Sequence, residues 1–281
     1  MEFDWKQYRD NYPDLYYAGL ITEVDVTKHY YKYGKNENRT FLKKDENNTS
    51  FGLGGRFGNI LFYNFVADYI SQRIDLKFNY RCHENMDSLG ITVHTGTKEY
   101  PETHILTDSN IDSIFDEIPN KNILLRGYFQ TPTVAKYIHS KIQSLKDSII
   151  QKNPYEYTNN NVFIHVRLGD IIGIHEDFSY YYSVLSGLQF DKGFISSDTI
   201  KHSICIKLIK KFNLQIFNGS EVETLQFGST NRHIVLSKGT FSWYIGALSF
   251  DSNVYYPEKI NGKLWHGDIF CLPEWNKVSY M

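Results

Sequence analysis

The chain has 281 residues and a formal net charge of −2 at pH 7, with its histidines counted as neutral. This length can form one large domain or two modest ones, and the nearly balanced charge argues against a nucleic acid or a membrane surface as the main partner. The three cysteines, Cys82, Cys205 and Cys271, are odd in number and lack metal-ligand spacing. We therefore expect buried, reduced thiols in a reducing compartment.

Leader and anchor segments are not expected. The first residues contain no basic region followed by an apolar run, which a secretory signal peptide needs. No uninterrupted apolar run approaches the roughly 20 residues that cross a membrane. The sequence thus predicts a cytoplasmic protein without a transmembrane segment.

Residues 1–41 are predicted to form a small helical module. Its first helix is indicated by aromatic and apolar residues at helical spacing, interrupted by one proline: Trp5, Tyr8, Tyr12, Leu15 and Tyr16, with Pro13 between them. A second helix is expected over Glu23–Tyr33, with Gly34 as its end. The polar residues 35–50 follow as a linker.

From residue 51 onward the sequence alternates predicted strands and helices. In the first half we expect helices over Ile60–Arg73, with Asn59 near the N-cap, and Thr133–Lys152, and strands over Asp75–Phe78, His104–Leu106 and Asn122–Leu125. In the second half we expect strands over Val162–Arg167, Phe194–Ser197, Leu214–Phe217, His233–Ser237 and Val254–Tyr256, and helices over Phe178–Leu188, Thr199–Phe212 and Phe241–Phe250. Such alternation is typical of parallel sheets. It predicts two Rossmann-like domains facing a cleft, over 51–154 and 160–281, separated by a break at Pro154.

The segment 162–170 is the most informative stretch. Apolar residues alternate along it, so a strand would carry His165 and Arg167 on one face, and Leu168, Gly169 and Asp170 would form the turn that follows. Ligands of open α/β sheets bind at the carboxyl ends of strands, and a planar guanidinium matches phosphate oxygens. The alternative is an ordinary surface His and Arg near a strand end.

A glycine cluster, residues 52–59, precedes the first predicted helix of the 51–154 domain and includes Arg56 and Asn59. Glycines let a backbone approach a ligand, and a helix N-terminus can bind an anion. Phe57 stands where the dinucleotide fingerprint requires a glycine, so that motif is absent. We interpret the cluster as a ligand loop, with a plain flexible loop as the alternative.

Two strand ends in the second half carry further polar side chains. Asp198 would accept hydrogen bonds from a nucleotide base or ribose, or would simply cap the next helix. Ser237, Thr240, Phe241 and Ser242 lie between a strand and a helix start. That place suits a phosphate, although Ser and Thr are also ordinary caps.

These strand ends occur in a chain with no P-loop and no D-x-D pair, which indicates a nucleotide diphosphate held without a divalent metal. His175, Glu176 and Asp177 are adjacent, so they cannot all face one ion on a regular element. We interpret them as part of a loop, on the acceptor side. Neither a nucleophile elbow nor a zinc motif is present.

Five segments in order resemble glycosyltransferase family 11, the α-1,2-fucosyltransferases, and share core signals with protein O-fucosyltransferases. They are Gly54–Asn59, Arg126–Gln130, His165–Asp170, Ser237–Trp243 with Ala247 and Leu248, and Pro273–Trp275. The resemblance covers about residues 51–278. Three positions differ from many family members: Leu168 stands in place of Arg, Ile60 in place of Gln, and Tyr244 in place of Trp.

The resemblance implies a GT-B-like fold and inverting, metal-independent transfer of fucose from GDP-fucose to a hydroxyl of a glycan acceptor, in α-1,2 linkage. It assigns catalysis to Arg167, His165 and Asp170, donor binding to Arg167, Asp198, Ser237, Thr240, Phe241 and Ser242, and the acceptor or sugar side to Arg56 and Asn59. Arg167 and the helix start would stabilise the leaving diphosphate. The general base stays open among Asp170, Glu176 and Asp177.

Two alternatives remain. Leu168 motivates a transferase that uses another GDP-sugar. The abundance of aromatic residues would serve a non-catalytic carbohydrate-binding protein equally well.

Overall fold

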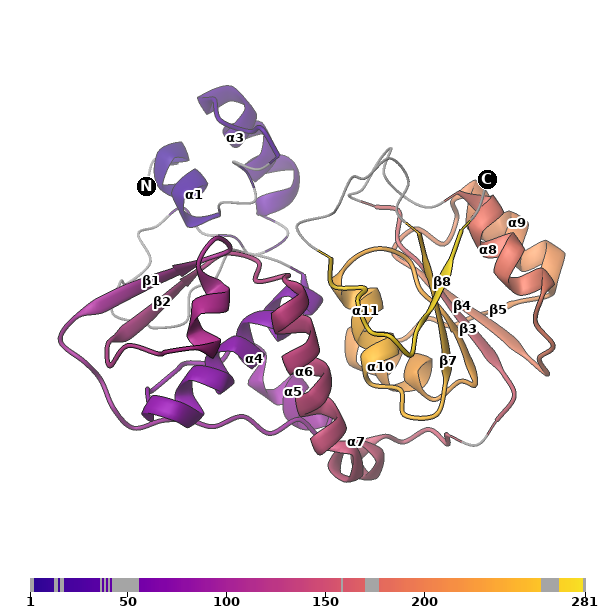
Figure 1. Cartoon of the computed structure of the whole chain (residues 1–281). Helices are drawn as coiled ribbons and strands as arrows, with labels where there is room; N and C mark the ends of the chain where they lie inside the picture. The colour runs from indigo at the N-terminus through magenta and orange to yellow at the C-terminus, as the bar shows by residue number, and fades with distance from the viewer. Residues whose placement is uncertain are drawn as a thin grey trace. The chain divides into compact units, whose positions relative to one another are not determined.

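The computed structural model describes residues 3–12, 15, 18–35, 37, 39, 41, 56–157, 159–169, 177–258 and 268–279. The chain divides into two compact units (Figure 1): unit 1 comprises residues 1–81 and 94–129, and unit 2 comprises residues 82–93 and 130–281. Each unit contains a parallel sheet together with helices. The predicted α/β class is therefore confirmed.

The N-terminal residues form short helices around a buried tyrosine. Helix α1 spans Trp5–Asn11, α3 spans Glu23–His29, and a π-helical turn, η1, spans Tyr30–Gly34. Tyr8 is fully buried, and its hydroxyl lies 3.1 Å from Nδ1 of His29. A Cβ at position 34 would overlap that hydroxyl, so Gly34 is needed for close packing as well as at the helix end. The first predicted helix is confirmed only over Trp5–Asn11, and the second is confirmed with its last turn in π-helical form.

The rest of unit 1 contains a long buried helix and two parallel strands. Helix α4 spans Phe57–Ile74, β1 spans Thr103–Thr107, η2 spans Ile111–Phe115, and β2 spans Asn122–Arg126. The expected N-cap at Asn59 is wrong, because Arg56 O already accepts the first helical bond, from Asn59 N at 2.9 Å. The expected strand Asp75–Phe78 is only an isolated bridge between Leu76 and Lys98.

Unit 2 contains a six-stranded parallel sheet. The strands are β3 (Val162–Val166), β4 (Gly193–Ser197), β5 (Gln215–Ile216), β6 (His233–Val235), β7 (Asn253–Pro257) and β8 (Asn276–Val278). They lie in the order β5-β4-β3-β6-β7-β8. Counted within the sheet, this is 3-2-1-4-5-6, the order of doubly wound sheets, in which the direction of winding reverses between β3 and β6.

Alternation along β3 separates two helical layers. Its Val162, Ile164 and Val166 pack in one apolar cluster with α8 (Phe178–Ser186) and α9 (Ser203–Phe212). On the opposite face, Phe163 contacts Phe227 of α10 (Glu221–Ser229), and His165 contacts Phe241 of α11 (Thr240–Ala247). Figure 1 shows these two pairs of helices on opposite sides of the sheet. His165 therefore shares a face with the helix start that follows β6.

The described residues of unit 2 form three further helices. They are α5 (His83–Ser88), α6 (Pro132–Ser144) and α7 (Lys146–Lys152). The single helix expected over Thr133–Lys152 is wrong, because Leu145, with φ −101° and ψ 10°, interrupts it. Gln226 Nε2 donates to Ser88 O at 2.9 Å and to Lys152 O at 3.3 Å. These bonds join α5 and α7 to α10 within unit 2. After α4, β1 and β2 the chain passes into unit 2 at 129–130, whereas we expected a boundary at 154–160.

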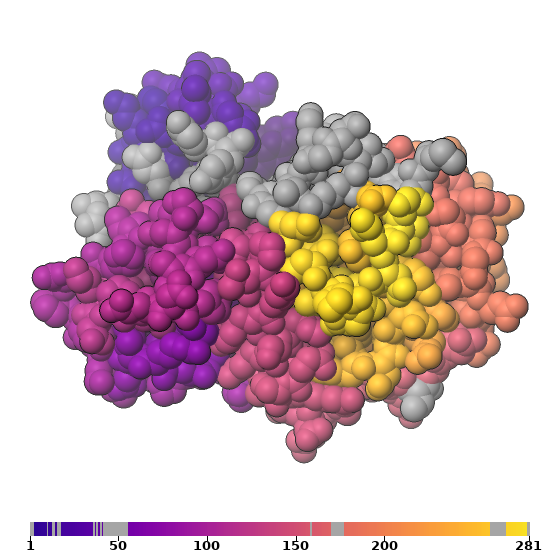
Figure 2. Space-filling model, in the orientation of Figure 1, coloured from indigo at the N-terminus to yellow at the C-terminus, as the bar shows by residue number. Residues whose placement is uncertain are grey.

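The last described residues lie at the edge of the sheet. All three residues of β8, Asn276–Val278, pair with β7. Residues 268–279, yellow in Figure 2, form part of the molecular surface in that view. Within the ranges that the structure describes, no helix is long and apolar enough to cross a membrane.

Candidate functional site

The candidate site lies at the carboxyl ends of β3, β4 and β6, where the winding of the sheet reverses. In an open α/β sheet this is the position at which adjacent connections leave on opposite faces and create a ligand crevice. The register pairs Val166 of β3 with Ser197 of β4, and Ile164 with Val235 of β6. The polar residues that follow these strands are therefore neighbours, although they lie far apart in the sequence.

His165 is held between β6 and α11. Its Nδ1 lies 3.2 Å from Oγ of Ser237, and its ring centroid lies 5.3 Å from that of Phe241. The imidazole is 6% exposed and the Ser237 side chain is fully buried. This arrangement defines the orientation of the ring, and it brings together three residues that we predicted for the site.

Arg167 packs on the loop that precedes α11. A Cβ at Gly239 would lie 2.5 Å from Arg167 Nη1, and Gly239 has a φ of +105°, so a side chain here would be both crowded and strained. The guanidinium thus lies directly against the N-cap residue of α11. β3 ends at Val166, one residue before Arg167, and His165 and Arg167 nevertheless contact the same β6–α11 segment.

The start of α11 is buried and fastened from inside. Trp243 N donates to Gly239 O at 3.0 Å, and the Ser242 hydroxyl accepts from Ser237 N at 2.9 Å. Thr240 and Ser242 are both buried. The N-terminal end of a helix carries partial positive charge, so this end and Arg167 make one cationic edge that suits a phosphate or diphosphate.

Asp198 does not cap the next helix, because the N-cap of α9 is His202. Instead, its Oδ1 accepts from Leu168 N at 2.9 Å and from Gly169 N at 3.2 Å, and its Oδ2 lies 3.1 Å from Gly169 N. The carboxylate therefore fastens the turn that follows β3. Its expected contact with a guanosine stays a prediction.

A cysteine and a tyrosine, Cys205 and Tyr180, are buried beneath the site. Burial raises the pKa of the Cys205 thiol, a hydrogen bond with Ser197 offsets part of the rise, and the carboxylate of Asp198 adds to it, so this cysteine stays a neutral packing residue. Tyr180, which is fully buried, donates its hydroxyl hydrogen to Leu236 O at 2.8 Å. It thereby supports the residue directly before Ser237.

The other predicted residues are distributed differently. Arg56 is exposed at the start of α4 and Asn59 lies in the first turn of that helix; both belong to unit 1, and their place beside the sugar stays a prediction. Gly52–Gly55, Asp170, His175 and Glu176 lie outside the described residues. Asp177 is exposed and is the N-cap of α8.

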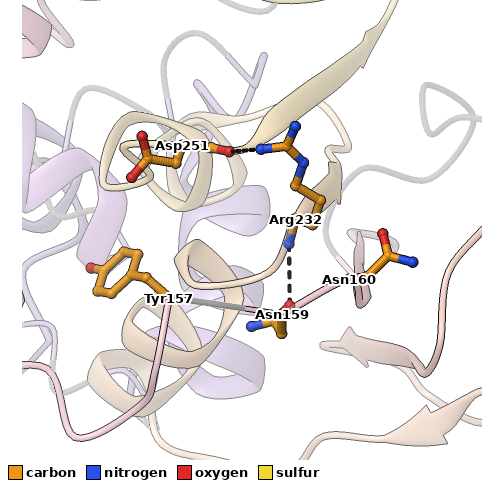
Figure 3. A pocket seen from close by; sticks show the side chains of 5 residues that line it. All are labelled: Tyr157, Asn159, Asn160, Arg232 and Asp251. Atoms are coloured by element: carbon orange, nitrogen blue, oxygen red, sulfur yellow. Dashed lines mark hydrogen bonds between the residues drawn. The ribbon is translucent and has the colours of Figure 1, made fainter.

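A separate depression of about 440 Å³ lies at the other end of the same sheet (Figure 3). It is lined by Tyr157, Asn159, Asn160, Arg232 and Asp251, which precede β3, β6 and β7. Arg232 Nη1 donates to Asp251 O at 2.8 Å. Because ligands of doubly wound sheets bind at the carboxyl ends, this depression is not the candidate site.

Residues that the sequence did not single out also contribute. Gly239 leaves room for the side chain of Arg167. Its place just before a predicted helix, next to Ser and Thr, is the sequence feature that could have identified it. Tyr180 gave no signal, because its partners are backbone carbonyls of Leu236 and of β7. In the part of the chain that the structure describes, no group of three or more His, Cys, Asp or Glu side chains could hold a metal ion.

No family model matches the chain, and neither a curated protein nor a solved structure matches it.

Proposed function

We propose that the chain is a glycosyltransferase of family 11 type that transfers fucose from GDP-fucose to a hydroxyl of a glycan. One observation carries the proposal: His165 and Arg167 converge with Ser237 and the start of α11 at the reversal point of a 3-2-1-4-5-6 sheet. Open α/β sheets bind nucleotides at this point, and a bidentate guanidinium with a helix N-terminus suits a diphosphate.

The proposed chemistry is inverting displacement at the anomeric carbon. The acceptor oxygen forms the new bond as the bond to the diphosphate oxygen breaks, and GDP leaves with the electron pair. Arg167 and the N–H groups of Thr240–Ser242 would stabilise the charge that develops on the leaving oxygens. A base must take the acceptor proton, and Asp170, Glu176 and Asp177 are the candidates.

The wider expectations belong to the same proposal. We propose a GT-B-like arrangement in which unit 2 binds the donor while Arg56 and Asn59 of unit 1 lie on the acceptor side. The chain carries no D-x-D pair, so transfer is proposed to be independent of a divalent metal. A cytoplasmic enzyme of this kind would modify a lipid-linked, nucleotide-linked or protein-linked glycan.

A second candidate function is supported by Leu168. Its side chain is buried in the apolar cluster under the site, where many family members carry Arg. A buried leucine cannot make the phosphate contact that an arginine could make at this position. This difference supports a donor other than GDP-fucose, namely another GDP-sugar. A non-catalytic carbohydrate-binding protein is the third alternative, and turnover separates it from the first two.

The test is a thermal-shift panel with GDP, UDP, ADP and CMP, followed by donor turnover with GDP-fucose in the presence and absence of EDTA. A ligand at about 100 times its dissociation constant stabilises the folded state by about 2.7 kcal/mol. We expect stabilisation by GDP and turnover that survives EDTA. Stabilisation by UDP alone, or by no nucleotide, would contradict the proposal. Binding of a sugar without turnover of any GDP-sugar would support the binding protein.

A further inference from the structure

Asp198 and Asp108 occupy the same position relative to their sheets. Asp198 follows Ser197, the last residue of β4, and the register pairs Ser197 with Val166, the residue directly before Arg167. Asp108 follows Thr107, the last residue of β1, and the register pairs Thr107 with Arg126, the residue directly before Gly127. One aspartate belongs to unit 2 and the other to unit 1.

Each carboxylate binds the backbone N–H groups of the second and third residues after the end of the neighbouring strand. Asp198 accepts from Leu168 N and Gly169 N, one and two residues beyond Arg167. Asp108 Oδ1 accepts from Tyr128 N at 2.7 Å and from Phe129 N at 2.6 Å, one and two residues beyond Gly127. Hydrogen bonds to a charged acceptor are the stronger kind, so each one defines the backbone course after its strand.

In unit 2 the fastened backbone carries the guanidinium of the candidate site. Arg167 directly precedes Leu168, whose N–H is held at 2.9 Å and whose side chain is buried in the core below. The guanidinium then lies against Gly239. A shift of the turn would therefore move Arg167 away from the start of α11.

We propose that Asp198 is a positioning residue for a diphosphate: it holds the turn after β3, and thereby holds Arg167 over the start of α11, rather than reading the nucleotide base. This inference rests on the proposed function of the same site. The negative charge of Asp198 distinguishes this positioning role from direct binding of the anion. A carboxylate beside an anion site repels the anion, so removing its charge without moving Arg167 would strengthen binding.

The experiment titrates inorganic pyrophosphate, GDP and UDP into wild-type protein, Asp198→Asn and Asp108→Asn, by calorimetry. The amide introduced by Asp198→Asn would keep one acceptor oxygen but would place an N–H₂ group near Gly169 N, where Oδ2 now lies. Asp108→Asn makes the same chemical change at the register-equivalent position of unit 1. It is the matched control for any general loss of stability.

We expect Asp198→Asn to raise the dissociation constants of all three ligands by one common factor, about three- to tenfold, because a charge-assisted bond is lost at an exposed position. Asp108→Asn should leave them unchanged. Weaker binding of GDP alone, with pyrophosphate unchanged, would overturn the inference in favour of base recognition. Unchanged or tighter binding of every ligand would also overturn it. If wild-type protein binds none of the three, the proposed function itself fails, which is a separate outcome.

Discussion

The turns that follow β2 and β3 are each held by an aspartate carboxylate that accepts two backbone hydrogen bonds, but the two turns differ in their exposure and in the side chains that they carry. In unit 1, Asp108 is half-buried, and Tyr128 and Phe129 are buried side chains. In unit 2, Asp198 and Gly169 are more open to solvent, and Arg167 is half-buried beside the start of α11. The first turn is closed by packing, whereas the second is exposed to solvent beside the proposed anion site. A shared backbone arrangement thus carries no function by itself; the side chains placed on it do.

The buried turn also stores backbone strain. Phe129 is completely buried and has a φ of +55°, a left-handed conformation that a bulky residue adopts only when its surroundings enforce it. Asp108 binds its N–H, and Tyr63 packs edge-on against its ring with centroids 5.4 Å apart. These contacts offset a cost of about 1–3 kcal/mol.

The largest effect should come from Phe129→Ala, which tests the closed turn. Removing a fully buried ring should lower the free energy of unfolding by about 3–5 kcal/mol, and alanine does not relieve the left-handed strain. Scanning calorimetry measures the loss. GDP affinity at a temperature where the variant is folded should equal that of the wild type, because the proposed anion site lies within unit 2. A marked fall in GDP affinity would remove the distinction between the turns.

Arg167→Ala is the reciprocal change in the open turn. We expect a loss of about 3–4 kcal/mol in transition-state stabilisation, seen as a fall of about 10²–10³ in donor turnover. The free energy of unfolding should change by less than about 0.5 kcal/mol, because no fully buried group is lost. Arg167→Lys, which keeps the charge without the planar fork, is the control and should recover only part of the activity. Full turnover in Arg167→Ala would contradict the account.

A smaller effect is expected from Gly239→Ala, which moves Arg167 without altering it. The added methyl group would lie 2.5 Å from Arg167 Nη1 at a residue with φ +105°. We expect weaker GDP binding, by about tenfold, and a loss of about 1–3 kcal/mol in the free energy of unfolding. Calorimetric titration and thermal unfolding measure the two quantities. Gly187→Ala, where a Cβ would meet nothing closer than 3.6 Å, is the matched control.

The smallest expected effect is on the pH dependence of stability, to which one partly buried histidine in each unit contributes. Burial lowers the pKa of His139 in unit 2, and Glu274 at 3.3 Å offsets part of the shift. Burial lowers the pKa of His29 in unit 1, and Arg39 lowers it further. As pH falls below the ordinary histidine value of about 6.5, the unfolded chain binds these protons first, so stability decreases.

The measurement is the unfolding temperature between pH 7 and pH 5. His139→Gln should flatten the pH dependence of the free energy of unfolding, by less than the about 1.4 kcal/mol per pH unit that a whole proton would give. His29→Gln should flatten the same pH dependence. Identical profiles for wild type and both variants would show that these imidazoles do not govern the acid response.

Much of unit 2 can be predicted because its strands are short apolar runs bounded by turn residues. The strand predicted over Val162–Arg167 matches β3 to within one residue, since Val162, Ile164 and Val166 alternate with the opposite face. The sharing of a face by His165 and Arg167 follows from the two-residue period of a strand alone. The polar turn after β6 is likewise visible as Ser, Gly and Thr before a helix.

Other features depend on information that the local sequence does not carry. The sequence did not reveal α10, although Ser220 and Glu223 form a capping box at its start, because its buried face includes Thr224 and Gln226 rather than an apolar stripe. β8 is three residues long and mostly polar. The roles of Asp108 and Asp198 depend on the register between neighbouring strands, which no local pattern reveals.

The most direct test of the central claim is a crystal structure of the chain with GDP. The account predicts the diphosphate between Arg167 and the first N–H groups of α11, within hydrogen-bond distance of both, with Asp198 still bound to the backbone of Leu168 and Gly169. A diphosphate bound elsewhere, for instance in the depression beside Arg232 at the opposite end of the sheet, would contradict it.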